Sequence, residues 1–158
     1  MGHQYSAVAA PISCEPPAIS LSEVLESQVD LRYDFTDSTL KRLTRSTPIG
    51  EIIDGVEVLW NQEGGRRMGY TVFGTAGASP TLTSSTSRHY ERYKVGDRYR
   101  RLTPTEYARL QGFPDDHCDP VAHGRQYCLL GNAVPPAVAH HGLSAALSRI
   151  GRIATAAA

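Results

Sequence analysis

The stretch RLTPTEYARLQGFP, residues 101–114, decides how the second half of this 158-residue chain folds. Thr103 has the side chain of a helix N-cap, Pro104 suits the first helical position, and Glu106 stands where it closes a capping box with Thr103. Gly112 favours the end of a helix, because glycine readily adopts the left-handed conformation of a C-terminal cap. The stretch therefore predicts a short helix that begins after Thr103 and ends before Gly112.

A second distinctive stretch, QYCLLGNAVPPAV at residues 126–138, lies shortly downstream. Pro135 and Pro136 are tolerated in the first turn of a helix, where backbone N–H groups have no partner within the helix. Apolar residues then recur at helical spacing; they are Val138, Leu143, Ala146, Leu147 and Ile150. We expect a C-terminal helix from about Pro135, ended by Gly151, and a frayed tail over residues 152–158.

Residues 49–102 have the pattern of a small sheet. IIDGVEVLW carries apolar residues on both sides of Asp54-Gly55, which is a two-residue hairpin signal. GYTVFGT and SPTLTSS are short β-prone runs, whereas NQEGGRRMG and TSSTSRHYERYKVGDRYR are expected to be polar loops. The segment predicts a small twisted β-rich region with long loops.

The residues before this region predict helices. ISLSEVLES begins with Ser20 as a possible N-cap and Glu23 in the position that closes a capping box, and STLKRLTR indicates a second short helix. Residues 1–18, rich in Ala, Pro and Ser, are expected to be a flexible leader, followed by a helical linking segment over residues 19–48. With the helices of residues 103–151, the chain is predicted to be α+β, a β-rich region flanked by short helices.

Charge is distributed unevenly along a chain whose net charge is zero. Residues 1–60 hold four Lys or Arg against nine Asp or Glu, whereas residues 61–110 hold nine basic residues against four acidic ones. The middle third is the candidate for contact with a nucleic-acid backbone, although a solvated arginine-rich surface explains the same excess. No apolar run approaches the roughly 20 residues that span a membrane, and no signal-peptide pattern is present, so we expect a cytoplasmic protein.

The three cysteines, Cys14, Cys118 and Cys128, are too few and too irregularly spaced for a disulfide scaffold. His117, Cys118, His123 and Cys128 fall within twelve residues and could be zinc ligands. Their spacing matches no common zinc finger or ribbon. We therefore expect ordinary loop and core residues and no metal site.

The two stretches together resemble the last two sequence motifs of the DNA (cytosine-5)-methyltransferases. Enzymes of that family flip a cytosine out of the duplex and methylate its ring carbon 5 with S-adenosylmethionine. The residues of the first stretch that carry the resemblance are Arg101, Leu102, Thr103, Glu106, Arg109, Gly112, Phe113 and Pro114. The resemblance implies that this motif braces the DNA-recognition region, although LTPTEYARL alone is also an ordinary capped amphipathic helix.

The resemblance extends upstream, where residues 49–102 correspond to the target recognition region. SPTLTSS is similar to a threonine-leucine step in these enzymes, which implies that Thr81 lies near the phosphate of the flipped nucleotide. The DNA contacts would come from this step and from two recognition loops; the candidates are Arg66, Arg67, Thr81, Thr83, Ser85 and Arg88. An arginine there could grip guanine bidentately or contact only phosphate, and the threonines could simply be sheet-forming residues.

The resemblance implies that the second motif contacts S-adenosylmethionine. Asn132, with the adjoining Ala133 and Val134, would close one edge of the cofactor pocket, since an Asn side chain offers both a donor and an acceptor to an amino-acid group. Gly131-Asn132 could instead be only a turn before a helix. The C-terminal helix would dock on a separate α/β catalytic domain.

The nucleophile of this chemistry is not found in the sequence. The family carries it in a Pro-Cys motif and the assisting acid in a Glu-Asn-Val motif, whereas Cys14, Cys118 and Cys128 here follow Ser, His and Tyr. We therefore assign no catalytic residue. We expect one subunit of a split, heterodimeric methyltransferase, inactive without a partner chain that carries both motifs, as in restriction-modification. The alternatives are a non-catalytic sequence-specific DNA-binding module and a remnant of a longer methyltransferase.

Overall fold

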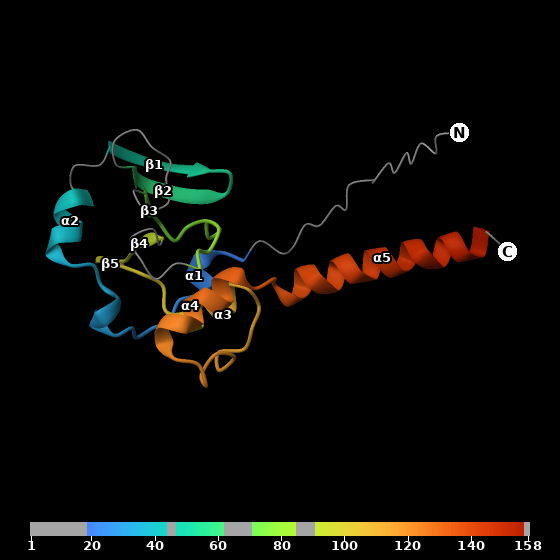
Figure 1. Ribbon diagram of the computed structural model, residues 1–158. Coiled ribbons are helices and arrows are strands. Elements are labelled where there is room, and N and C mark those ends of the chain that lie inside the picture. The colour runs from blue at the N-terminus through green and yellow to red at the C-terminus, as the bar shows by residue number, and fades with distance from the viewer. Residues whose placement is uncertain (1–18, 44–46, 62–70, 85–90, 157–158) are drawn as a thin grey trace, which may run out of the picture.

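The computed structural model describes residues 19–43, 47–61, 71–84 and 91–156 (Figure 1). One sheet of five strands lies beside a group of short helices, and the last helix projects away from both. The strands follow one another across the sheet; they are β1 Thr47–Ile53, β2 Val56–Asn61, β3 Thr71–Phe73, β4 Arg92–Val95 and β5 Arg98–Arg100. The helices are α1 Leu21–Val24, η1 Leu31–Tyr33, α2 Asp37–Leu43, α3 Pro104–Leu110, α4 His123–Asn132 and α5 Pro136–Ala156. The predicted α+β class is confirmed.

Strands β1 and β2 form the predicted hairpin. Their antiparallel pairing closes at Ile53 and Val56, and both residues of the turn have positive φ, 51° at Asp54 and 81° at Gly55. Two successive left-handed residues are the geometry that an Asp-Gly hairpin turn favours, because it matches the twist of the flanking strands. The sequence signal at this turn is therefore confirmed.

The structure corrects the prediction for the rest of the β-region. The described residues 79–84 of SPTLTSS form no strand, whereas RYKVGDRYR, expected to belong to a loop, contains the antiparallel strands β4 and β5 with a turn at Gly96 of φ 57°. Strand β4 pairs with β3 in parallel, so the connection between them is a crossover. Charged and apolar residues alternate in RYKV and RYR, but their arginine content resembles that of a polar loop.

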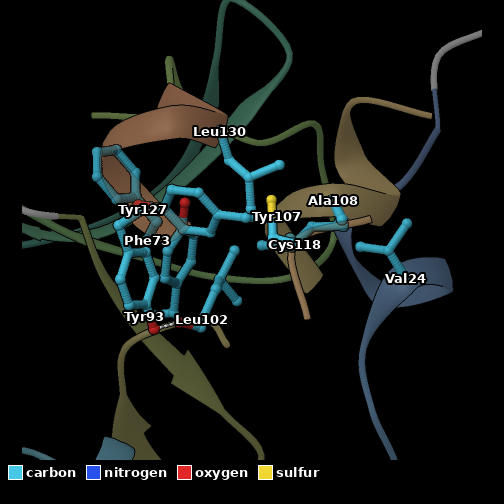
Figure 2. Close-up of a cluster of buried hydrophobic side chains, with 10 residues drawn as sticks. Val24, Phe73, Tyr93, Leu102, Tyr107, Ala108, Cys118, Tyr127 and Leu130 are labelled. Carbon is cyan, nitrogen blue, oxygen red and sulfur yellow. Dashed lines mark hydrogen bonds between the residues drawn. The ribbon is translucent and has the colours of Figure 1, made fainter. Parts of the chain in front are cut away.

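The hydrophobic core lies between the sheet and helices α1, α3 and α4 (Figure 2). Its members come from both halves of the chain; they include Val24, Phe73, Tyr93, Leu102, Tyr107, Ala108, Tyr127 and Leu130. The rings of Tyr107 and Tyr127 meet edge to face, with centroids 5.1 Å apart and an interplanar angle of 88°. Aromatic pairs favour this arrangement, and it fixes α3 against α4.

Both ends of α3 are closed as the sequence predicts. The Thr103 N–H donates to Glu106 Oε2 at 2.8 Å, and the Glu106 N–H donates to Thr103 Oγ1 at 3.1 Å. Gly112 has φ 75°, and the N–H of Phe113 donates to the carbonyl of Ala108 at 2.9 Å, as in a Schellman cap. The helix limits are therefore set by local sequence.

The carboxylate of Glu106 also binds a buried cation. Arg100, at the end of β5, donates two hydrogen bonds of 2.7 Å to the two oxygens of Glu106, and the two side chains are only 2% and 0% exposed. The backbone N–H of Glu26, just after α1, donates to the same carboxylate at 3.0 Å. One side chain therefore joins α1, β5 and α3.

Two helical features differ from prediction. Helix α4 was not predicted, and Gly131 and Asn132 form its last turn instead of a turn outside any helix. Helix α5 continues through Gly151 to Ala156, so the predicted stop at Gly151 is wrong. Glycine lowers helix propensity by about 1 kcal/mol but does not by itself end a helix. No helix in the described part of the chain is long and apolar enough to cross a membrane.

Replacing Glu106 by Gln should lower the free energy of unfolding by about 3–5 kcal/mol, because it leaves the buried Arg100 guanidinium without a countercharge. Urea denaturation followed by circular dichroism measures this loss. The matched control is Asp115→Asn, which breaks an ion pair with Arg109 whose Asp side chain is 58% exposed. The control should denature at the wild-type midpoint. Equal losses in the two variants would contradict the central role of the buried pair.

Candidate DNA and cofactor site

A groove brings the two sequence motifs and the threonine-leucine step together. Its volume is about 480 Å³, and it is lined by Ile19 and by residues from three stretches, 78–82, 110–112 and 131–138. These stretches belong to the β3–β4 crossover, the end of α3, and the junction of α4 with α5. Thr81, a predicted DNA contact, and Ala133, a predicted cofactor contact, therefore line one groove.

The two residues of the threonine-leucine step differ in solvent exposure. Thr81 is exposed, while Leu82 packs against the core and Thr83 is half-buried. The N–H of Thr83 donates to the carboxylate of Glu91, and the hydroxyl of Thr83 is buried without a hydrogen-bond partner among the described residues. The backbone at Thr83 is thereby fixed, and the exposed Thr81 lies two residues before it.

A glycine holds the second motif against this step. A Cβ at Gly131 would lie 2.5 Å from the backbone N of Ser84 and 2.6 Å from the carbonyl carbon of Thr83. No side chain fits such a gap, so only glycine allows the last turn of α4 to contact the crossover backbone. The side-chain amide of Gln111, at the end of α3, donates to the carbonyl of Leu130 beside it. The two motifs and the step are thereby packed into one unit.

The predicted cofactor residues lie at the C-terminal end of α4. Asn132 is exposed and its side-chain amide donates to the carbonyl of Cys128 at 2.8 Å; Ala133 is half-buried and Val134 is 60% exposed. The C-terminus of a helix carries a partial negative charge, which suits a cation such as the ammonium or sulfonium group of S-adenosylmethionine. These three residues could form one wall of a pocket for that cofactor.

The motif residues predicted to brace the DNA-recognition region make several contacts within the fold. The buried Arg101 guanidinium lies 3.6 Å from the ring centroid of Tyr127, a cation–π contact at the base of α4. Arg109 donates to both oxygens of Asp115, at 2.8 and 2.6 Å, and this hydrogen bond lowers the pKa of Asp115. Arg109 also donates to the carbonyl of Val24 at 3.2 Å. Pro114 is exposed.

The basic residues of the middle region have internal partners wherever the structure describes them. Arg98 pairs with Asp34 at 2.7 Å, in addition to the pairs of Arg100 and Arg109. Arg92, Lys94 and Arg101 each lie against an aromatic ring. Six of the nine basic residues of this region are described, and each of the six makes at least one contact within the fold. The other predicted DNA contacts, Arg66, Arg67, Ser85 and Arg88, lie outside the described residues.

The thiol of Cys118 does not have the environment of a nucleophile, whereas the thiol of Cys128 is exposed. Cys118 is buried, and this burial raises the pKa of its thiol, so the reactive thiolate is disfavoured at neutral pH. His117 stacks on Phe113 and the Nε2 of His123 lies 2.9 Å from the hydroxyl of Tyr33. Within the described ranges no three His, Cys, Asp or Glu side chains gather as a metal site.

Comparison with known proteins identifies the class of protein. The family described as C-5 cytosine-specific DNA methylase matches residues 16–147. The chain therefore belongs to the C-5 cytosine-specific DNA methylase family.

The relatives are longer than this chain. The type II methyltransferase M.SsoII of Shigella sonnei is 29% identical over 120 residues, which cover 72% of this chain and 28% of that protein. The type II methyltransferase M1.ScrFI of Lactococcus lactis subsp. cremoris is 30% identical over 131 residues, which cover 76% of this chain and 29% of that protein. The chain thus spans less than a third of the length of these relatives.

A solved structure has the same fold over most of the chain. The crystal structure of S. pombe Dnmt2 methyltransferase matches with a TM-score of 0.57 and covers 87% of this chain and 44% of that one. The sequence identity is 18%, so the likeness concerns the fold alone.

The sequence did not indicate two buried polar residues beside the groove, Glu91 and Gln111. Glu91 is fully buried although it stands within the polar stretch RHYERY, and Gln111 is buried at the end of α3. A signal for Glu91 exists in retrospect, since it is the sole acidic residue between residues 64 and 96. Its partners Thr83 and Tyr107 lie too far away along the chain for any local pattern to indicate them.

Replacing Gly131 by Ala should destabilise the protein by about 1–3 kcal/mol, because the added methyl group must push the backbone of Thr83 and Ser84 aside. The same substitution at Gly124, on the same helix, meets nothing within 4 Å and should cost nothing. Thermal denaturation of both variants measures the difference. A Gly131→Ala variant as stable as Gly124→Ala would show that the crossover does not pack on α4.

Proposed function

We propose that this chain is the DNA-recognition and cofactor-edge part of a DNA (cytosine-5)-methyltransferase. The observation that carries the proposal is the shared groove, in which Thr81 and Ala133 line one surface held together by Gly131. A methyltransferase of this kind must bring the target nucleotide and the methyl donor to one place. The family assignment and the groove support the same function from independent directions.

The chain's own residues would bind and orient, and a partner would supply the chemistry. When bound, S-adenosylmethionine supplies the methyl group, and Asn132, Ala133 and Val134 would hold one edge of it. Thr81 would hold a phosphate beside the flipped cytosine, with the bases read from the loops that carry Arg66, Arg67, Ser85 and Arg88. The nucleophilic cysteine and the acid would come from a separate polypeptide with Pro-Cys and Glu-Asn-Val motifs.

Helix α5 supports the docking of such a partner. Its apolar side chains are exposed along the helix; they are Val138 at 43%, Leu143 at 66%, Leu147 at 67% and Ile150 at 63%. Figure 1 shows this helix directed away from the body of the protein. A continuous apolar stripe on a lone helix is expected to bury itself against another protein surface. An α/β catalytic domain is the occupant that we propose.

Methyl transfer should require both polypeptides. The chain and a protein with the Pro-Cys and Glu-Asn-Val motifs, encoded next to it, are purified alone and together and given duplex DNA with tritium-labelled S-adenosylmethionine. We expect label in DNA only from the mixture. Label from this chain alone would refute the proposal. An inactive mixture, with specific duplex binding by this chain, would instead favour a non-catalytic DNA-binding module.

Sequence selection should depend on the loop that carries Arg66 and Arg67. If either arginine reads a guanine, changing it to Ala should lose about 1–3 kcal/mol of discrimination at one base pair. If it grips phosphate, binding should weaken for all sequences and the salt dependence should decrease by about one counterion. Arg125→Ala, an exposed arginine on α4, is the control. Wild-type affinity and selectivity in both loop variants would exclude this loop from the interface.

A further inference from the structure

Glu91 is a carboxylate with no contact to solvent. Its residue is 0% exposed, and it stands immediately before β4, next to the stretch 85–90. Burying a carboxylate is costly unless its oxygens accept good hydrogen bonds. The hydrogen-bond partners of the Glu91 carboxylate therefore determine whether its burial is tolerated.

Among the described residues, each oxygen of Glu91 accepts a hydrogen bond from a different part of the chain. Oε1 accepts from the backbone N–H of Thr83, and Oε2 accepts from the hydroxyl of Tyr107 on α3. Burial, and then the charge of Glu91, raise the pKa of Tyr107, so the phenol keeps its proton and remains a donor. The carboxylate therefore links the crossover backbone to the helix of the first motif.

The link acts on the residues next to the groove. Leu82 packs into the core, and the last turn of α4 contacts Thr83 and Ser84. The hydrogen bond from Thr83 to Glu91 adds to these contacts on the backbone of residues 82–84. On the other side, the hydroxyl of Ser79 lies 3.1 Å from that of Tyr93. Thr81, exposed between these two anchors, has its position determined by them.

We infer that Glu91 is a positioning residue that sets the backbone of residues 81–83 for contact with a DNA phosphate, and that Tyr107 orients its carboxylate. The inference rests on the proposed function for the DNA part of its role. The expected change in DNA affinity distinguishes positioning from electrostatics. If electrostatics alone mattered, removing the negative charge of Glu91 near a polyanion should strengthen DNA binding. If Glu91 positions the backbone, the same change should weaken DNA binding.

The test compares four variants of the full chain. Glu91→Ala removes both acceptors. Glu91→Gln keeps the shape, one acceptor for Thr83 and a donor that can meet the Tyr107 oxygen. Tyr107→Phe removes the orienting hydroxyl together with its hydrogen bond to Arg101. Tyr127→Phe is the matched control, because it removes a buried hydroxyl that bonds to the carbonyl of Leu102 at 2.8 Å.

Two readouts are combined. Amide hydrogen exchange, resolved by NMR, should show Thr83 exchanging about ten-fold faster or more in Glu91→Ala, while the amides of α3 and α4 keep wild-type rates. Tyr107→Phe should give a smaller increase, Glu91→Gln should restore most of the protection, and Tyr127→Phe should leave Thr83 unchanged. Binding to a fluorescent duplex of mixed sequence should weaken roughly ten-fold in Glu91→Ala and recover in Glu91→Gln.

The outcomes separate the inference from the function on which it rests. Unchanged Thr83 exchange in Glu91→Ala, or duplex binding as tight as that of wild type or tighter, would overturn the positioning role. A wild-type chain that binds no duplex would overturn the proposed DNA function, and the exchange data would still decide whether Glu91 fixes the crossover. Faster exchange throughout α3 and α4 in every Glu91 and Tyr107 variant would reduce Glu91 to a general stabilising residue.

Discussion

The buried ion pair between Arg100 and Glu106 is the interaction on which the rest of this structure depends. Two short hydrogen bonds join the end of the sheet to the first motif helix, and the same carboxylate closes the capping box and accepts the N–H of Glu26. Desolvating both charges is costly, so the pair is tolerated only because each oxygen has partners. Its value is geometric, since it fixes α1, β5 and α3 relative to one another.

Other buried polar groups extend this arrangement to the groove. Hydrogen bonds of Glu91 join the crossover to α3, and a hydrogen bond of Gln111 joins α3 to α4. The hydroxyl of Tyr127 joins α4 to Leu102 in the same way. A small domain has limited apolar surface to bury, so directional bonds determine which backbone segments meet. Hydrogen bonds and core packing both hold the groove, and the absence of a side chain at Gly131 allows its walls to approach closely.

The parts of the fold that sequence predicted are those governed by neighbouring residues. Thr103, Pro104 and Gly112 set the limits of α3, and Asp54-Gly55 sets the first hairpin, because caps and tight turns are decided within a few residues. The hairpin of β4 and β5 was missed. Charged and apolar residues alternate in RYKV and RYR, but the arginine content gave the segment the composition of a polar loop.

By itself, the sequence determined the family, the candidate groups for DNA and cofactor, the ends of α3 and the turn of the first hairpin, since motif spacing, capping and tight turns are properties of short stretches. Only the tertiary structure decided that Thr81 and Ala133 line one groove, that the described basic residues of the middle region make contacts within the fold, and that Glu91 is buried against Thr83 and Tyr107. The physical reason is that these contacts join residues distant in the chain, and their energies depend on burial, which no local pattern specifies.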